Sequence, residues 1–135
     1  MEVECKILGE LDHPNKNGQI YPKVEMEKAI KDYLNSGRRY GEFNPNYGEL
    51  SHPVSLSNIS HEVKDINIVG EDVIGKFELL DTPQGKIAKN IIKAGSNLKF
   101  APRIIAQVES IEKGSGKHTG ETKLKDIQII SVDIV

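Results

Sequence analysis

The stretch LSNISHEVKDINIVGEDVIGKFELL, residues 56–80, decides the fold class of this chain. It contains two segments rich in β-branched residues, which favour strands, on either side of Gly70-Glu71-Asp72. Turn-forming residues between two such segments predict a β-hairpin. The middle of the chain is therefore expected to be an antiparallel pair of strands.

A helix is predicted on each side of this hairpin. In YPKVEMEKAIKDYLNSG (residues 21–37), Pro22 suits a first helical turn and Gly37 is placed to end the helix. In TPQGKIAKNIIKAGSN (residues 82–97), Thr82 can cap a helix that Pro83 starts and Gly95 ends. Apolar residues recur at helical spacing in both: Met26, Ala29, Ile30, Tyr33 and Leu34 in the first, and Ile87, Ala88, Ile91 and Ile92 in the second.

Three further segments are predicted strands: 2–11, 98–111 and 123–135. The stretch RRYGEFNPNYGELSHP, residues 38–53, has several glycines and prolines and no period, so it is predicted to be an irregular loop. Five or so strands with two helices and no strict βαβ alternation predict an α+β fold with an antiparallel or mixed sheet. A length of 135 residues fits a single domain, residues 1–135.

Composition excludes several classes of protein. The 18 basic and 20 acidic residues are interspersed and leave a formal charge of −2, unlike the basic stripe of a nucleic-acid-binding protein. A single cysteine, Cys5, excludes an internal disulfide and fits a reducing compartment. No apolar run approaches the ~20 residues of a membrane span, and the N-terminus lacks a secretion signal. A soluble, intracellular protein without a membrane or nucleic-acid partner is expected.

Two motif-like stretches do not complete a known site. HEVKD, residues 61–65, has Asp65 where a zinc-protease helix needs its second histidine, and the surrounding pattern is that of a strand. GSGKHTG, residues 114–120, lacks the full phosphate-loop spacing. Neither a zinc site at HEVKD nor a phosphate site at GSGKHTG is therefore expected.

One phrase occurs almost twice: GELDHP at residues 9–14 and GELSHP at residues 48–53. Each places a histidine, His13 or His52, directly before a proline. The residues alone favour an ordinary loop histidine in both cases.

Five segments, taken in order, resemble the prohead proteases of tailed bacteriophages, especially their T-even branch. They are NKNGQIYPKVEMEKAIKDYLN (15–35), GELSHP (48–53), VIGKFELLDTPQGKIAKNIIKAG (73–95), FAPR (100–103) and SVDIV (131–135). Those enzymes share the serine-protease fold of herpesvirus assemblin. The resemblance implies an α+β fold whose core is a mostly antiparallel, β-barrel-like sheet with two or more helices.

The resemblance also implies a function. It is that of a capsid maturation serine endopeptidase that cleaves scaffold and capsid-associated proteins, and itself, inside the assembling prohead in the host cytoplasm. No cofactor is implied, and self-association is possible within the wider fold family. Because the chain ends at the last family strand, we expect a core fragment that lacks a C-terminal tail.

Matching the family's motifs residue by residue assigns the general base to His52. Aligning the family arginine with Arg103, a residue that supports the oxyanion loop in the family, puts Ala101 where the nucleophilic serine belongs. Alanine has no hydroxyl, so the chain as written should form no acyl-enzyme. Either the serine was deliberately replaced to prevent self-cleavage, or the chain is a naturally inactive relative. The intact histidine loop and flanking motifs favour the first explanation.

The third catalytic member implied by the resemblance is acidic and lies on the last strand. Asp133 is the candidate to orient His52, and strand alternation places it on the face of Ile127, Ile129 and Ser131. A carboxylate among isoleucines needs a partner, and a histidine N–H is suitable. An ordinary aspartate near a strand end is an equally good interpretation. His61 is the alternative residue to orient His52, and His13 matches no catalytic position.

Two other functions stay open. The chain could be a catalytically inactive protein of the prohead that uses the protease fold for scaffolding or structure, with Ala101 natural. A small zinc hydrolase built on HEVKD is the third hypothesis, and it would require a bound metal.

Overall fold

A computed structural model of the chain describes residues 1–37, 39–45, 54–113 and 117–135, and the side chains of these residues except 110–113 and 117–120. A 3₁₀ turn precedes β4, and the predicted alternation of strands with two helices is confirmed. The elements in chain order are β1 (Glu2–Leu8), β2 (Gln19–Ile20), α1 (Lys23–Asn35), β3 (Tyr40–Glu42), the turn Leu56–Asn58, β4 (Ile59–Val69), β5 (Asp72–Leu79), α2 (Pro83–Lys93), β6 (Phe100–Lys113) and β7 (Lys117–Ile134).

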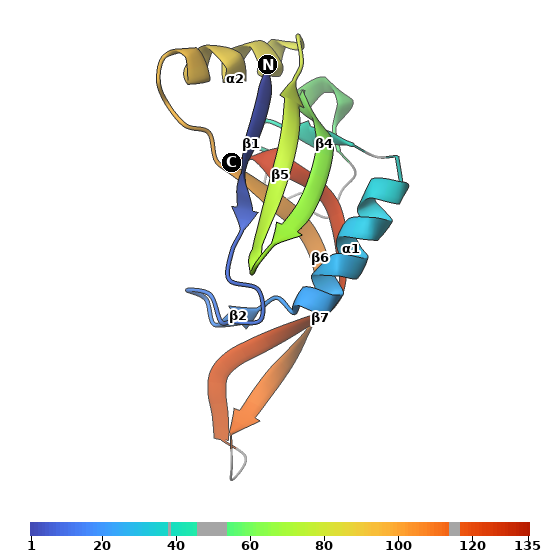
Figure 1. Ribbon diagram of the computed structural model, residues 1–135, viewed down its shortest axis with the longest axis vertical. Coiled ribbons are helices and arrows are strands. Elements are labelled where there is room, and N and C mark those ends of the chain that lie inside the picture. The colour runs from blue at the N-terminus through green and yellow to red at the C-terminus, as the bar shows by residue number, and fades with distance from the viewer. Residues whose placement is uncertain (38, 46–53, 114–116) are drawn as a thin grey trace.

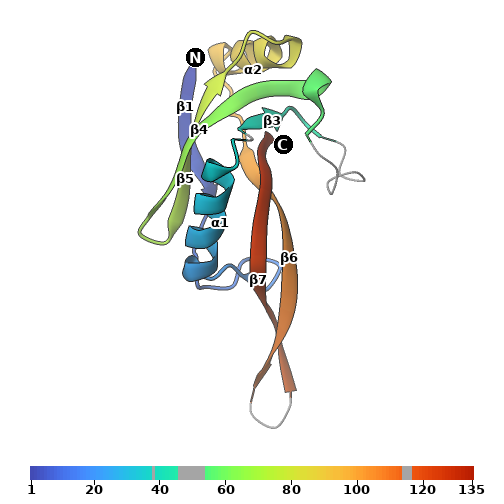
Figure 2. The ribbon, with the colours of Figure 1, turned by 90° about the vertical axis from the view of Figure 1, so that its right-hand side faces the viewer.

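The strands form two sheets. The first has the order β1-β5-β4-β3, and all its neighbours are antiparallel. The second has the order β2-β7-β6, in which β6 and β7 are antiparallel and β2 is parallel to β7. The β6–β7 pair extends well beyond the rest of the molecule (Figures 1 and 2). The expected α+β fold with mostly antiparallel sheets is confirmed, and the sheets stay separate rather than closing into one barrel.

Helix α1 follows its sequence signals closely. Pro22 precedes the first helical residue with an extended backbone, and Gly37 adopts a positive φ of 75° just beyond the helix. Met26, Ala29, Ile30 and Tyr33 are buried, as their spacing predicts. No helix in the described residues is long and apolar enough to cross a membrane.

Helix α2 begins as predicted, but its predicted apolar stripe is only partly buried. The Thr82 side chain accepts a hydrogen bond of 3.0 Å from the backbone N–H of Gly85, and Pro83 starts the helix. Ile87, expected in the apolar stripe, is 48% exposed, whereas Gly85 and Ala88 are buried. A Cβ atom at Gly85 would overlap the carbonyl oxygen of Leu80. The helix therefore lies close to the sheet through Gly85 and Ala88, and Ile92 packs partly buried against the core.

The stretch predicted as an irregular loop contains strand β3. Its central residue, Gly41, pairs with His61 of β4. A Cβ atom at Gly41 would overlap the His61 ring and the carbonyl oxygen of Val132 in β7. Glycine therefore lets β3 pass between β4 and the end of β7, where Phe43 forms an isolated bridge to Ile134.

The core lies between the two sheets and contains an imidazole. The rings of Phe77 and Phe100 stack with centroids 4.2 Å apart, and the fully buried His61 contacts both edge-on, at 5.5 and 5.1 Å. Apolar residues of β4, β5, α1 and β7 complete this core: Val63, Ile66, Val73, Leu79, Met26, Ile30, Val132 and Ile134.

The hydrogen bonds of His61 define its tautomer. Its Nε2 lies 2.6 Å from the carbonyl oxygen of Val132, which can only accept, so Nε2 carries the proton. Its Nδ1 then accepts from the Ser60 hydroxyl at 2.7 Å. Burial lowers the pKa of His61, although the Val132 carbonyl and Asp133 act in the opposite direction. The folded chain thus holds His61 neutral.

The depressed pKa of His61 predicts that the protein loses stability on mild acidification. Below the ordinary histidine pKa of ~6.5, the unfolded chain binds a proton at His61 that the folded chain does not. The unfolding free energy should therefore fall with decreasing pH in this range, by at most about 1.4 kcal/mol per pH unit from this group. Urea denaturation between pH 7.5 and 5.5 measures the slope.

His13 supplies a matched control of opposite sign. Its hydrogen bond and ion pair with Glu71 raise the pKa of His13, so its contribution is present below the unfolded pKa and is lost as pH rises through the folded pKa. His13→Gln should steepen the loss on acidification, and His61→Gln should flatten it. NMR of the unmodified chain should show that the His61 ring titrates below the ordinary histidine pKa of ~6.5. A ring that titrates at the ordinary value would contradict the prediction.

Candidate active site

The candidate residues of β6 and β7 lie on one face of their sheet. Ala101 pairs with Asp133, and Arg103 pairs with Ser131. Directly opposed residues of an antiparallel pair share a face, as do residues two apart in one strand. The alternate residues Phe100, Val132 and Ile134 are buried in the core. The opposite face therefore brings together Ala101, Arg103, Ser131 and Asp133.

A bulge in β7 corrects the predicted alternation along this strand. Arg103 pairs with Ser131, but the next residue of β6, Ile104, pairs with Ile129. Ile130 is therefore an extra residue, and such an insertion transfers the following residues to the other face. Asp133 consequently does not share the face of Ile129, as the uninterrupted alternation predicted. Its surroundings are polar rather than aliphatic.

Arg103 is a buried cation held by two carboxylates. Its Nε donates to Oδ2 of Asp133 at 2.8 Å, and its Nη2 donates to Oε2 of Glu42 at 2.7 Å. The side chains of all three residues are less than 10% exposed. A buried charge is costly unless it is paired and hydrogen-bonded, and both conditions are met here. Strand β3 is thereby joined to β6 and β7.

The second oxygen of Asp133 is also engaged. Its Oδ1 accepts from the Ser131 hydroxyl and from the backbone N–H of Glu42, each at 3.0 Å. Asp133 therefore has three donors among the described residues, from β3, β6 and β7. An ionised carboxylate offers about four acceptor positions, so about one more donor can be accommodated.

Glu42 and the residue after it, Phe43, are also hydrogen-bonded to Asn58, which directly precedes β4. Its Oε1 accepts from the Asn58 amide at 3.2 Å, and the same amide donates to the carbonyl oxygen of Phe43 at 2.9 Å. The backbone N–H of Phe43 donates to the carbonyl oxygen of Asn58 at 3.2 Å. Burial alone would raise the pKa of Glu42, but the hydrogen bonds from Arg103, Asn58 and the Ser55 backbone outweigh it and lower this pKa. Glu42 is thus held as a carboxylate beside Arg103.

Sequence reasoning did not identify Glu42 or Asn58. The one available signal was Arg103 itself, because a buried arginine in a strand needs more than one acceptor. Nothing in the sequence singles out Glu42 among the 20 acidic residues of the chain. Glu42 meets Arg103 because β3 passes beside β7, and the sequence pattern does not reveal this strand.

The histidines are in very different positions. His52 lies outside the described residues. His13 is in an exposed turn, with Nε2 3.0 Å from Oε1 of Glu71, as its position in GELDHP predicts. His61 forms a short contact with Ser60 that has the spacing of a catalytic pair, but both residues are fully buried. Since both ring nitrogens of His61 have partners, it offers no free N–H or lone pair to a second imidazole.

Ala101 is half-buried at the start of β6, opposite Asp133. Within the described part of the chain, no three histidine, cysteine, aspartate or glutamate side chains are grouped to hold a metal ion. Among the described residues, Ala101 is paired with Asp133, and Arg103 and the Ser131 hydroxyl are hydrogen-bonded to this carboxylate.

Comparisons with known proteins point to one family. A family model described as "prohead core protein serine protease" matches residues 4–135. The prohead core protein protease of Enterobacteria phage T4 is 33% identical over 84 residues, which cover 57% of this chain and 38% of that protein. The structure of the bacteriophage T4 capsid assembly protease, gp21, matches with a TM-score of 0.76 at 25% identity, over 99% of this chain and 80% of that chain.

The matched region therefore spans well under half the length of the curated T4 relative. The family match, in contrast, extends over nearly the whole chain, including both sheets and every candidate residue. The chain belongs to the prohead core protein serine protease family.

Proposed function

We propose that this chain is the protease domain of a capsid maturation serine endopeptidase, in which Ala101 replaces the nucleophilic serine. Its substrates are scaffold and capsid-associated proteins, and the protease itself, inside a phage prohead in the host cytoplasm. Family membership supports the reaction class. The observation that carries the assignment is the position of Ala101, directly opposite Asp133 and two residues before the buried Arg103.

In the proposed mechanism, a serine at position 101 attacks the scissile carbonyl. His52 takes the hydroxyl proton and later returns it to the leaving amine. Backbone N–H groups near Arg103 stabilise the oxyanion. The buried ion pairs hold Arg103, and with it this part of β6, in place relative to β3 and β7.

Asp133 is the proposed group that orients His52. The support is its buried carboxylate beside position 101, with about one acceptor position left beyond its three donors. An N–H of His52 would occupy that position, which would fix the tautomer and stabilise the imidazolium.

A structural role within the prohead is the second candidate function. The observation in its favour is Ala101, since a chain without a hydroxyl there has no nucleophile at the proposed position. In that case the buried network around Arg103 would serve the fold alone. The zinc hydrolase hypothesis has no such support, because His61 is enclosed in the core.

Restoring the hydroxyl tests the proposed reaction. Ala101→Ser should convert an inert chain into one that cleaves itself or a cognate scaffold protein, followed by intact mass over time. Adding His52→Ala should reduce the rate at least ~10³-fold, since the serine then lacks its base.

The two variants also separate the candidate functions. Ala101→Thr, which adds a hydroxyl on a bulkier β-branched side chain, is a control for the geometry of the nucleophile. If Ala101→Ser stays folded by circular dichroism and leaves a cognate scaffold intact, the enzyme proposal is wrong and the structural role is supported. Cleavage that does not depend on His52 would reject His52 as the base.

The role of Asp133 can be tested against Glu42, since both carboxylates bind Arg103. In the Ala101→Ser background, Asp133→Asn and Glu42→Gln each remove one charge from a buried pair. Both should destabilise the fold by about 3 kcal/mol or more. Only Asp133→Asn should also slow cleavage, by roughly 10³-fold or more, because it alone affects the histidine.

Cleavage rates at pH 7, divided by the folded fraction from circular dichroism, separate the two effects. Glu42→Gln is expected to stay within about tenfold of the parent rate on this scale. Equal losses in the two variants would show that Asp133 acts only by supporting Arg103.

A further inference from the structure

One edge of β7 is partly unpaired among the residues that the structure describes. On the side away from β6, β2 pairs with Thr122 and Lys123, and Phe43 bridges to Ile134. Between these two contacts, no described strand pairs with β7. An unpaired edge presents backbone N–H and C=O groups to whatever lies beside it, and it can accept an added strand.

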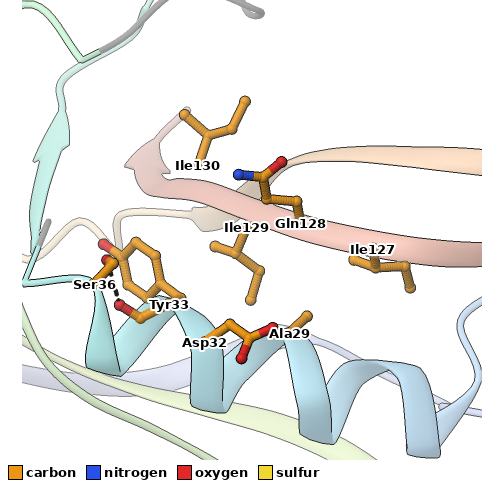
Figure 3. A pocket seen from close by; sticks show the side chains of 8 residues that line it. All are labelled: Ala29, Asp32, Tyr33, Ser36, Ile127, Gln128, Ile129 and Ile130. Carbon is orange, nitrogen blue, oxygen red and sulfur yellow. Dashed lines mark hydrogen bonds between the residues drawn. The ribbon is translucent and has the colours of Figure 1, made fainter.

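A pocket of about 310 Å³ lies along this unpaired edge, between β7 and α1. On the strand it is lined by four consecutive residues, 127–130. Figure 3 shows Ile129 directed toward α1, whereas Gln128 and Ile130 extend to the opposite side. A pocket lined from both sides of a strand lies along its edge, since successive side chains point to opposite faces. Its volume is at the lower end of the range of ligand pockets.

The helical wall of the pocket combines a small residue with a charge. Ala29 and Asp32 of α1 and its C-cap Ser36 line the pocket at helical spacing. Asp32 is exposed and forms no ion pair with the described residues. Together with the isoleucines of β7, this wall suits an aliphatic side chain accompanied by a lysine or arginine.

We propose that the unpaired edge of β7 over residues 127–130 binds an extended segment of a substrate protein as an added strand. The segment places an aliphatic side chain between α1 and β7 and a basic side chain against Asp32. The backbone groups of the edge select a polypeptide in extended form. The identification of the partner as a substrate rests on the proposed protease function.

This docking site is separate from the candidate active site. Asp133, which pairs with Ala101, lies three residues beyond Ile130, or about 10 Å along an extended strand. The segment that follows β3 bridges to β7 beyond Asp133, through Phe43 and Ile134. The site would therefore hold a substrate near Ala101 without containing the scissile bond.

Binding can be measured on the chain as it stands, because Ala101 prevents cleavage under the proposed mechanism. The probe is a fluorescein-labelled heptapeptide of alternating threonine and isoleucine with a central lysine. Its control has prolines at alternate positions, which cannot donate to a strand edge. We expect slower amide exchange at residues 127–131 with the first peptide only.

Two variants test the contacts. Asp32→Lys should weaken binding of the probe roughly fivefold, whereas the same charge change at the exposed Glu27 on another face of α1 should not alter it.

The remaining outcomes are equally decisive. The proposal is wrong if the two peptides bind with equal affinity. It is also wrong if amide exchange at the edge is slow without peptide and becomes slower as the protein concentration rises. The latter result would identify a second copy of the chain as the occupant. Since this assay needs no cleavage, its failure is independent of the result of Ala101→Ser.

Discussion

The structure around the candidate site depends on the burial of one cation. The guanidinium of Arg103 is almost excluded from water, and it is stable there because Asp133 and Glu42 both accept its hydrogen bonds. These partners come from β7 and β3, so the ion pairs fix three strands at one point. Removing either carboxylate would leave the buried guanidinium only partly compensated. The loss of stability would be far larger than that from breaking an exposed ion pair.

Much of the fold could be predicted from local signals. The hairpin of β4 and β5, the cap of α2 at Thr82 and the end of α1 at Gly37 follow directly from turn and capping chemistry. Strand β3 could not be predicted, because its three residues contain a glycine and are too few to show a period. It is stabilised by pairing with β4, a contact between distant parts of the sequence.

The site was predictable only in part, for the same reason. Strand position and family motifs indicated Ala101, Arg103 and Asp133, and β6 and β7 bring these three together. The surroundings of Asp133 were predicted wrongly, since an uninterrupted alternation placed it among isoleucines. One additional residue, Ile130, changes the face of everything that follows, and a bulge of this kind has no clear mark in the sequence. Glu42 was missed because only the tertiary path of β3 brings it to Arg103.

The same bulge explains how one strand, β7, can face both the apolar space beside α1 and the polar surroundings of Arg103. Before it, Ile127 and Ile129 line the space between the strand and α1, and after it Ser131 and Asp133 face Arg103. A regular strand would have kept all four on one face, and Asp133 could then not have met Arg103 without exposing the isoleucines. The insertion therefore lets one strand be apolar toward the helix and polar toward the site. It also lies at the unpaired edge, where an added strand would have to follow its bend.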